Sequence, residues 1–202
     1  MRFLLHSKSG MSYLNLEGED FKYIIKVRRH QIGDQIALRS LDNLSIEHLY
    51  QIDSVAGREC SLKLLSSREN RVENLSKLHI GWCIVDPKTI EKALPYLTEM
   101  GVHSITFIRC DRSQNQFRLD FARFHRIVES SIMQSGRTTL IKFQESKSVK
   151  QFLEEYPEGI IFERHIAVDN EQMFTVKEII RNTKDKEIQV FAKGRIIRIG
   201  DM

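Results

Sequence analysis

The segment Leu78-His79-Ile80-Gly81-Trp82-Cys83-Ile84-Val85-Asp86-Pro87, with the pattern that follows it as far as Gly101, decides the fold of this 202-residue chain. The run from Leu78 to Val85 is apolar in the way that is typical of a strand covered on both faces. Asp86-Pro87 then provides a helix N-cap followed by proline at the first helical position. Apolar side chains recur at helical spacing up to Gly101, which stands where a left-handed C-terminal cap belongs. The segment therefore predicts a buried strand followed by an amphipathic helix, which Pro95 is expected to bend.

A second strand and a second long helix continue this pattern. Ser104 to Arg109 is the next strand, and short links between strand, helix and strand favour a parallel pair with a right-handed crossover. A helix from about Asp120 to Ser135 ends at Gly136. The remaining elements are a short helix and two strands, predicted at Val149–Glu155, Gly159–Phe162 and Ile188–Phe191. Together they predict an α/β domain with a mainly parallel sheet over residues 74–202.

The chain before this domain is rich in strands. Turn signals at Gly33-Asp34, Asp42-Asn43 and Ala56-Gly57 separate short alternating segments. One helix is expected from Glu19 to His30, with Arg28 on the same face as its apolar residues. Five strands are predicted, at Arg2–His6, Ser12–Leu16, Gln35–Arg39, Ile46–Val55 and Cys60–Leu65. This combination indicates a small closed β-barrel over residues 1–70, and the polar stretch Ser66–Lys77 is the expected boundary.

Composition limits the class of protein. Hydrophobic residues make up 41% and charged residues 29% of the chain, which is typical of a globular protein. A formal charge of +4 and a pI of about 9.0 suit a polyanionic partner. No apolar run approaches the length of a membrane span, and the N-terminus lacks the features of an export signal. The three cysteines, Cys60, Cys83 and Cys110, are expected to be free thiols, which favours a cytoplasmic protein.

Several kinds of site lack their motifs. The sequence contains no Gly-rich phosphate loop, no Cys or His pair at zinc spacing and no nucleophile elbow. Hydrolase, kinase and structural-metal functions are therefore disfavoured, and no metal is expected. Three weaker segments remain, in a fixed order along the chain. They are Asp86-Pro87-Lys88 before the helix that ends Glu99-Met100-Gly101-Val102, Asp111-Arg112-Ser113 before the helix that ends Gln134-Ser135-Gly136-Arg137, and Lys193-Gly194-Arg195-Ile196-Ile197-Arg198.

The order of these segments resembles the bacterial family of small-subunit ribosomal RNA uridine-N3 methyltransferases, which belong to the SPOUT class. The resemblance covers nearly the whole chain and includes Glu17-Gly18-Glu19-Asp20, Val27-Arg28-Arg29 and Ile32-Gly33-Asp34 near the N-terminus. It implies a PUA-like barrel that binds RNA, followed by a trefoil-knotted α/β domain that uses S-adenosylmethionine to methylate ribosomal RNA. It also implies a homodimer whose active site is built across the two-fold interface.

The resemblance assigns roles to individual residues. Gln134 would bond the edge of the uracil, and Arg137 would stabilise the charge that develops on the ring. The segment from Gly194 through Arg195, Ile196 and Ile197 to Arg198 would wrap the cofactor. The phosphate contacts would come from Lys26, Arg28, Arg29 and Arg112. Simpler alternatives stay open at each place: a polar helix end, a final core strand with basic neighbours, and a solvated charged face.

The chain also departs from the family pattern. The family's Gly-Pro-Glu-Gly-Gly loop, which lines the cofactor site, is absent between Phe162 and Arg195, and Ser130 and Met133 replace acidic residues that usually precede the glutamine. Two functions therefore remain open. The first is an S-adenosylmethionine-dependent RNA methyltransferase. The alternative is a non-catalytic RNA-binding relative that has lost the cofactor loop.

Overall fold

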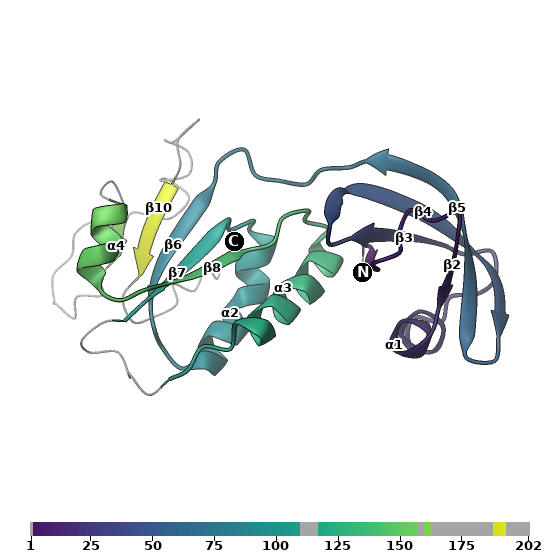
Figure 1. Ribbon diagram of the computed structural model, residues 1–202, viewed down its shortest axis with the longest axis horizontal. Coiled ribbons are helices and arrows are strands. Elements are labelled where there is room, and N and C mark those ends of the chain that lie inside the picture. Colours follow the sequence, from purple (N-terminus) through teal and green to yellow (C-terminus); the bar gives the residue numbers. More distant parts are fainter. Residues whose placement is uncertain (1, 110–116, 157–159, 163–187, 193–202) are drawn as a thin grey trace, which may run out of the picture. The chain divides into compact units, whose positions relative to one another are not determined.

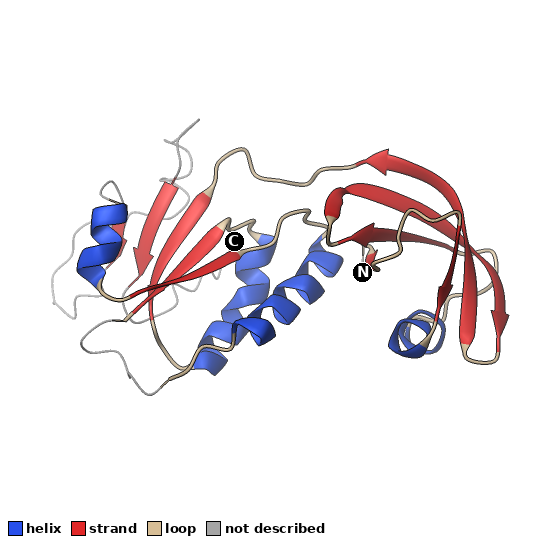
Figure 2. Cartoon of the chain, in the orientation of Figure 1, coloured by secondary structure: helices blue, strands red, loops and turns tan. Residues whose placement is uncertain are grey.

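The computed structural model of the chain describes residues 2–109, 117–156, 160–162 and 188–192. These residues form a mixed α/β fold with one curled sheet and one parallel sheet (Figures 1 and 2). The chain divides into two compact units. Unit 1 comprises Met1–Val72 and Ile132–Thr138, and unit 2 comprises Glu73–Ser131 and Thr139–Met202.

Unit 1 is built on a five-stranded curled sheet in the order β1-β3-β4-β5-β2. Strands β1 and β3 are parallel, and the other neighbours are antiparallel. All five predicted strands are present, as β1 (Leu4–Leu5), β2 (Tyr13–Leu16), β3 (Gln35–Ser40), β4 (Asn43–Ala56) and β5 (Glu59–Glu69). The core lies on one face of this sheet because alternate residues of a strand point to opposite faces. Burial of each fully buried core side chain, such as Leu16 or Ile24, stabilises the folded state by about 1.5–3 kcal/mol.

The predicted N-terminal helix differs in kind from expectation. The structure has a short α-helix, α1 (Gly18–Phe21), which continues directly as a π-helix, η1 (Lys22–Val27). Phe21 and Ile24 are buried as predicted, whereas Arg28 is exposed. A π-helix bonds residue i to residue i+5, so it advances each side chain by less than an α-helix does. Arg28 therefore leaves the apolar face on which a regular α-helix would have placed it.

Strand β5 ends later than predicted. Strand β5 continues to Glu69, so the first four residues of the polar stretch Ser66–Lys77 belong to the sheet. Their partners lie on β4, where Arg68 is opposite Glu47 and Glu69 is opposite Ile46. These residues carry no hydrophobic pattern because their side chains are exposed, and backbone pairing with β4 holds them in the strand.

A buried arginine ties β3 to β4 and to the end of β5. Only 1% of the Arg39 side chain is exposed, and its Nη2 donates to Glu47 Oε2 at 3.0 Å. Its Nη1 donates to the backbone oxygens of Leu44 and Asn70. Arg68 reaches Glu47 Oε1 at 2.6 Å from the solvent side. Burial opposes the ionised form of Glu47, but these donors and charges together hold the pKa of its carboxyl below the ordinary value.

Unit 2 contains a five-stranded parallel sheet in the order β8-β7-β6-β10-β9. The predicted strands are confirmed as β6 (Leu78–Cys83), β7 (Ser104–Ile108), β9 (Ile160–Phe162) and β10 (Ile188–Ala192). Strand β8 (Lys142–Ser146) was not predicted, because it is an edge strand whose side chains are mostly exposed. Every residue of β7 is buried, as expected for a strand covered on both faces.

Three helices accompany the parallel sheet. They are α2 (Pro87–Glu99), α3 (Phe121–Ser135) and α4 (Val149–Glu155). Asp86 caps α2 by accepting from the backbone N–H of Lys88, and Gly101 follows the helix with a φ of 77°. Helix α2 runs through Pro95, whose side chain is exposed. Helices α2 and α3 lie side by side (Figure 1). Arg123 Nε of α3 donates to Glu91 Oε1 of α2 at 2.6 Å.

The cysteine prediction is correct in one place and wrong in another. Cys60 is a free buried thiol, and burial raises its pKa. Cys83 is also buried, but it is disulfide-bonded. Cys110 lies outside the described residues. Wide separation in sequence suggested free thiols, yet the fold and not the spacing decides which sulfur atoms meet.

Candidate functional site

The end of helix α3 carries both residues expected to contact the base. Asp120 starts the helix by accepting from the backbone N–H of Arg123 at 2.9 Å. Gly136 ends it: its φ is 84°, and its N–H donates to the backbone oxygen of Ile132 at 2.8 Å. Gln134 is exposed on the last turn, and Arg137 is half-buried just beyond it. The side chain of Gln134 makes no hydrogen bond to any described residue, so its amide is available to a ligand.

The N-terminal strand segment of unit 1 holds this helix end in place. The backbone N–H of Arg2 donates to the backbone oxygen of Met133 at 2.7 Å, and that of Leu5 donates to Met133 Sδ at 3.4 Å. On the other side, the N–H of Val72 donates to Thr138 Oγ1 at 3.0 Å. A Cβ at Gly136 would lie 3.3 Å from Arg2 Cγ, so the chain passes close to Arg2 at this point. Gln134 and Arg137 therefore project from a well-anchored segment.

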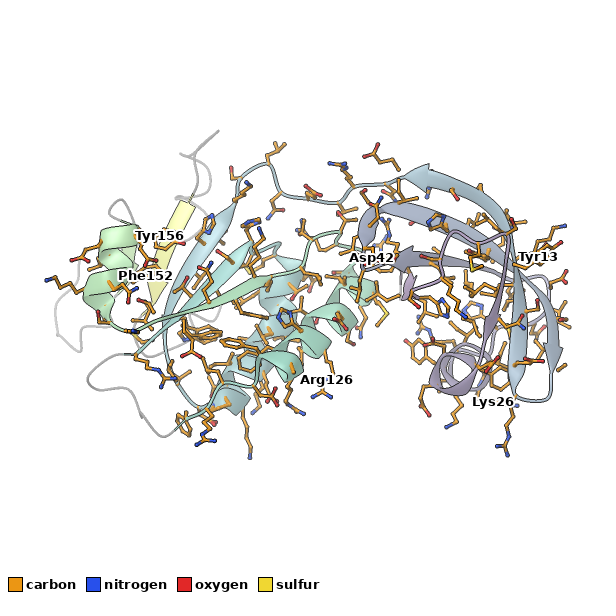
Figure 3. All side chains as sticks on the ribbon, viewed as in Figure 1. Tyr13, Lys26, Asp42, Arg126, Phe152 and Tyr156 are labelled. Carbon is orange, nitrogen blue, oxygen red and sulfur yellow. The ribbon has the colours of Figure 1, made fainter. Side chains whose placement is uncertain are left out.

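Three exposed cations gather at the end of η1. Lys26, Arg28 and Arg29 form no ion pair with any described residue, in contrast to Lys22 on the same element, which contacts Glu19 at 2.6 Å. Figure 3 shows Lys26 projecting outward from this part of the chain. Unpaired cations retain their full attraction for an anionic ligand, because no neighbouring carboxylate neutralises them. We call these three residues the η1 cation cluster.

Two of these cations lie near aromatic rings, a feature that the sequence analysis did not predict. Lys26 Nζ lies 5.8 Å from the centre of the Phe21 ring, and Arg28 Cζ lies 5.9 Å from that of Tyr23. Both pairs are five residues apart, the spacing that a π-helix brings onto one side. The backbone confirms that spacing, because the N–H of Arg28 donates to the oxygen of Tyr23 at 2.9 Å. The sequence did contain a signal for these contacts, because an aromatic residue precedes each of the two cations by five positions.

Arg29 has a different means of support. Its φ of 61° is the one positive value at a non-glycine residue in the described backbone. A left-handed conformation at such a residue costs about 1 kcal/mol or more and persists where neighbouring contacts enforce it. The next two residues in the chain supply such contacts. The backbone N–H of His30 donates to the backbone oxygen of Ile24 at 3.1 Å, and the backbone N–H of Gln31 donates to Asp34 Oδ2 at 2.9 Å. These bonds fix the backbone that follows Arg29, whose side chain is exposed.

The carboxyl edge of the parallel sheet is the place where a cofactor would be expected. In parallel sheets, ligands bind beyond the carboxyl ends of the strands, where the strand order changes direction. Here the change lies between β6 and β10, whose ends meet where Trp82 is opposite Ala192. Residues Lys193–Arg198 follow β10 directly in the sequence. The predicted cofactor residues Gly194–Arg198 and the predicted phosphate contact Arg112 lie outside the described residues.

Trp82 leaves an unused donor near this edge. Its side chain is 4% exposed and stacks at 6.1 Å from Phe107, and its Nε1 has no hydrogen-bond acceptor among the described residues. An unsatisfied buried donor is costly unless a ligand or water accepts from it.

Among the described residues there is no group of three or more potential metal ligands. None of the described helices is long and apolar enough to span a membrane.

Comparison with known proteins identifies the family. The model of the RNA methyltransferase domain matches residues 72–197, and the chain belongs to this family. A curated relative, the ribosomal RNA small subunit methyltransferase E of Helicobacter pylori, is 28% identical over 166 residues, which are 81% of this chain and 73% of the relative.

Solved structures agree on the fold. A probable rRNA methyltransferase from Porphyromonas gingivalis has a TM-score of 0.72 and 17% identity, covering 95% of this chain and 79% of that chain. A ribosomal RNA small subunit methyltransferase E from Neisseria gonorrhoeae, bound to S-adenosyl methionine, has a TM-score of 0.67 and 18% identity, covering 95% and 80%. Both units of the present chain are therefore part of one known architecture.

Proposed function

We propose that this protein transfers the methyl group of S-adenosylmethionine to N3 of a uridine in small-subunit ribosomal RNA. The observation that carries this proposal is the relation to the Helicobacter pylori enzyme, which extends over 81% of the chain. The family match over residues 72–197 supports the reaction type. The S-adenosyl methionine bound to the Neisseria gonorrhoeae protein supports the cofactor.

In this proposal, each part of the chain has a distinct role. Residues 1–70 act as a PUA-like barrel that binds RNA, and residues 74–202 act as a SPOUT methyltransferase domain with a trefoil knot. The protein works as a homodimer in the cytoplasm, where ribosomal RNA is found. The curled sheet of unit 1 and the parallel order of β6, β7 and β8 are compatible with these assignments.

The η1 cation cluster is the proposed phosphate-binding element, and Arg112 is proposed as a further phosphate contact. Lys26, Arg28 and Arg29 are exposed and free of carboxylate partners among the described residues, which suits contact with an RNA backbone. Phosphate contacts fix the position of the RNA without reading its sequence. Gln134 and Arg137 belong to the same compact unit as this cluster. One unit would therefore hold the RNA and present the groups that contact the base.

The cation cluster gives a direct prediction. Replacing Arg28 and Arg29 together with alanine should weaken binding to small-subunit ribosomal RNA and reduce the slope of log affinity against log salt by about 2, because two phosphate contacts are lost. Fluorescence anisotropy over a salt series measures both quantities. Lys22→Ala is the matched control, since Glu19 already neutralises that cation. Unchanged affinity and slope in the double variant would mean that this cluster does not anchor the RNA.

The chemistry requires an unpaired uracil with its N3 edge exposed. In the reaction the bond from sulfur to the methyl group breaks, the bond from the methyl group to N3 forms, and the N3 proton leaves to solvent. The amide of Gln134 is proposed to hold the uracil edge by hydrogen bonds. Arg137 is proposed to stabilise the negative charge that develops on the ring oxygens as the proton departs. Both roles need groups on a rigid support, which the anchored end of α3 supplies.

Gly194, Arg195, Ile196, Ile197 and Arg198 are proposed to hold the cofactor, since they follow β10 at the carboxyl edge of the sheet. The unsatisfied indole N–H of Trp82 near this edge is compatible with a bound polar ligand. The cofactor supplies a methyl group already activated by a sulfonium, so that no metal is needed. The protein's task is to align the uracil with that group and to exclude water.

One observation favours a second function. The Gly-Pro-Glu-Gly-Gly loop of the resembled family is absent from the sequence between Phe162 and Arg195. Without it, the chain would be an RNA-binding relative that has lost catalysis. Both candidates bind ribosomal RNA through unit 1, so that RNA affinity does not separate them. The affinity for the cofactor does.

Isothermal titration calorimetry with S-adenosylmethionine and with its demethylated product separates the two functions. We expect saturable binding to the full chain, and we expect Arg198→Ala to weaken it by disturbing the proposed pocket. Arg126→Ala is the matched control, because Arg126 is an exposed arginine on α3 (Figure 3) and is not among the proposed cofactor residues. Absence of binding by the parent chain would leave only the RNA-binding function. Equal losses in both arginine variants would remove Arg198 from the pocket.

A further inference from the structure

The outer face of the curled sheet carries a row of side chains that the proposed site does not use. The strand registers place Tyr13 of β2 opposite Lys63 of β5, Lys63 opposite Gln51 of β4, and Gln51 opposite Gln35 of β3. The four residues therefore form one line across four strands. We call this line the outer row.

The outer row faces solvent because the residues beside it fill the core. Leu14 and Leu62, the sequence neighbours of Tyr13 and Lys63, are 4% and 0% exposed. Alternation then points Tyr13 and Lys63 away from the core. Tyr13 is 59% exposed, and Figure 3 shows it on the outer side of the sheet. Lys63 is exposed and has no ion-pair partner among the described residues.

Two further exposed apolar side chains widen the surface around Tyr13. Met11 is 55% exposed and Leu65 is 43% exposed. The N–H of Leu64 donates to the oxygen of Ser12 at 2.9 Å, so β5 runs on beside the residues that precede β2. Tyr13 is thus an exposed aromatic ring with an exposed lysine directly opposite it. Single exposed apolar residues need no explanation, but an exposed ring opposite a lysine without an ion-pair partner among the described residues combines two features that suit a nucleic acid.

The opposite end of the outer row leads to the loop that follows the η1 cation cluster. Gln51 Nε2 donates to the backbone oxygen of Gly33 at 3.1 Å. The N–H of Gly33 in turn donates to the oxygen of Ile52 at 2.8 Å. The loop from Arg29 to Gly33 is therefore attached to the strand next to Lys63. The η1 cation cluster and the outer row are therefore joined through this loop, on which Ile32 is also exposed.

We propose that the outer row is a second RNA contact, in which Tyr13 stacks on an unpaired base and Lys63 binds the adjoining phosphate. An aromatic ring beside a cation is the combination that binds single-stranded nucleic acid, whereas duplex bases are already stacked on one another. The amides of Gln35 and Gln51 suit base edges and phosphate oxygens better than an apolar protein surface. This inference rests on the proposed function, since it takes the RNA to be the ligand already held by the cation cluster.

The test uses the full chain and a fluorescein-labelled oligouridylate, with affinity measured by anisotropy. Tyr13→Ser should bind about tenfold more weakly, the effect of losing one stacked base. Tyr13→Phe keeps the ring and should bind within about twofold of the parent. Lys63→Ala should reduce the salt slope by about 1. Tyr96→Ser is the matched control, because Tyr96 is 70% exposed and lies on α2 of the other unit.

Photocrosslinking supplies a readout that does not depend on a variant's folding. In the parent chain, 5-iodouridine placed in the same oligonucleotide should crosslink to the peptide that contains Tyr13. Crosslinks found only in other peptides would overturn the proposal. So would a Tyr13→Ser variant that binds like the parent.

The outer row and the η1 cation cluster can be tested separately. If Tyr13→Ser binds normally while the Arg28→Ala, Arg29→Ala double variant is weakened, the outer row is excluded and the cation cluster stands. If neither variant is weakened, the RNA-binding role of this face and of the cluster fails together. A second copy of the chain is the competing occupant. A change of mass in RNA-free sedimentation on Tyr13→Ser would assign the outer row to that copy and overturn the proposal.

Discussion

Replacing Gln134 with alanine is expected to lower methyl transfer to small-subunit ribosomal RNA about 100-fold or more, because the amide is proposed to hold the uracil edge in place and a misplaced reacting group costs a factor of this order. The affinity for S-adenosylmethionine should change little, because Gln134 is proposed to contact the base and not the cofactor. The side chain is exposed, so the thermal midpoint of unfolding should stay close to that of the parent. Transfer of a radiolabelled methyl group, calorimetry and thermal unfolding measure the three quantities.

The matched control for Gln134 is Gln144→Ala, which removes an exposed glutamine from the edge strand β8. It should retain full transfer. Gln134→Glu provides a sharper comparison, because it preserves the shape but replaces the amide donor with a negative charge near the uracil. We expect it to be at least as inactive as the alanine variant. Near-normal transfer by Gln134→Ala would show that the end of α3 does not contact the reacting base.

Replacing Glu47 with leucine is expected to destabilise the protein by about 3–5 kcal/mol, since it leaves the Arg39 guanidinium buried without its carboxylate. The 3.0 Å contact between them involves an arginine that is 1% exposed and a glutamate that is 13% exposed. The double variant Arg39→Met, Glu47→Leu should recover much of the loss, because two apolar side chains leave no buried charge. Urea unfolding monitored by circular dichroism gives the free energies.

The control for this pair is Glu69→Leu, which breaks the exposed pair between Glu69 and Arg71. Their side chains are 60% and 62% exposed, and such pairs contribute about 0–1 kcal/mol. A double variant no more stable than Glu47→Leu would contradict the argument, because it would show that the charge on Arg39 is not the source of the loss.

The same network predicts how stability depends on pH. The folded-state pKa of Glu47 lies below its ordinary value of 4.5, so the ionised carboxylate stabilises the folded state. This contribution is fully present above pH 4.5 and is lost as the pH falls through the lowered pKa. Glu47→Gln should remove that part of the acid dependence. Unfolding free energies measured from neutral to acidic pH would test it, and an unchanged acid limb would contradict it.

Much of the fold could be predicted from the chain because hydrophobic periodicity is a local property. The run from Leu78 to Val85 and the Asp86-Pro87 cap predicted β6 and α2, and the alternation before residue 70 predicted the five strands of the curled sheet. Strand β8 was not predicted, because an exposed edge strand has no apolar periodicity. The last four residues of β5, Ser66 to Glu69, were not predicted for a similar reason. Backbone pairing with β4 keeps them extended, and their side chains are not buried.

What the sequence by itself determined is the order of the elements, the α/β class of the second half and the short motifs that suggested the candidate residues. The tertiary structure decided which side chains are held and which are free. It showed that a π-helix sets Lys26 and Arg28 over aromatic rings, that Met133 anchors the segment bearing Gln134, and that Arg39 is buried. The physical reason is that hydrophobic periodicity records burial within one element. The anchoring of α3 depends on residues distant in the chain, and the cation–π contacts depend on a π-helical geometry that hydrophobic periodicity does not reveal.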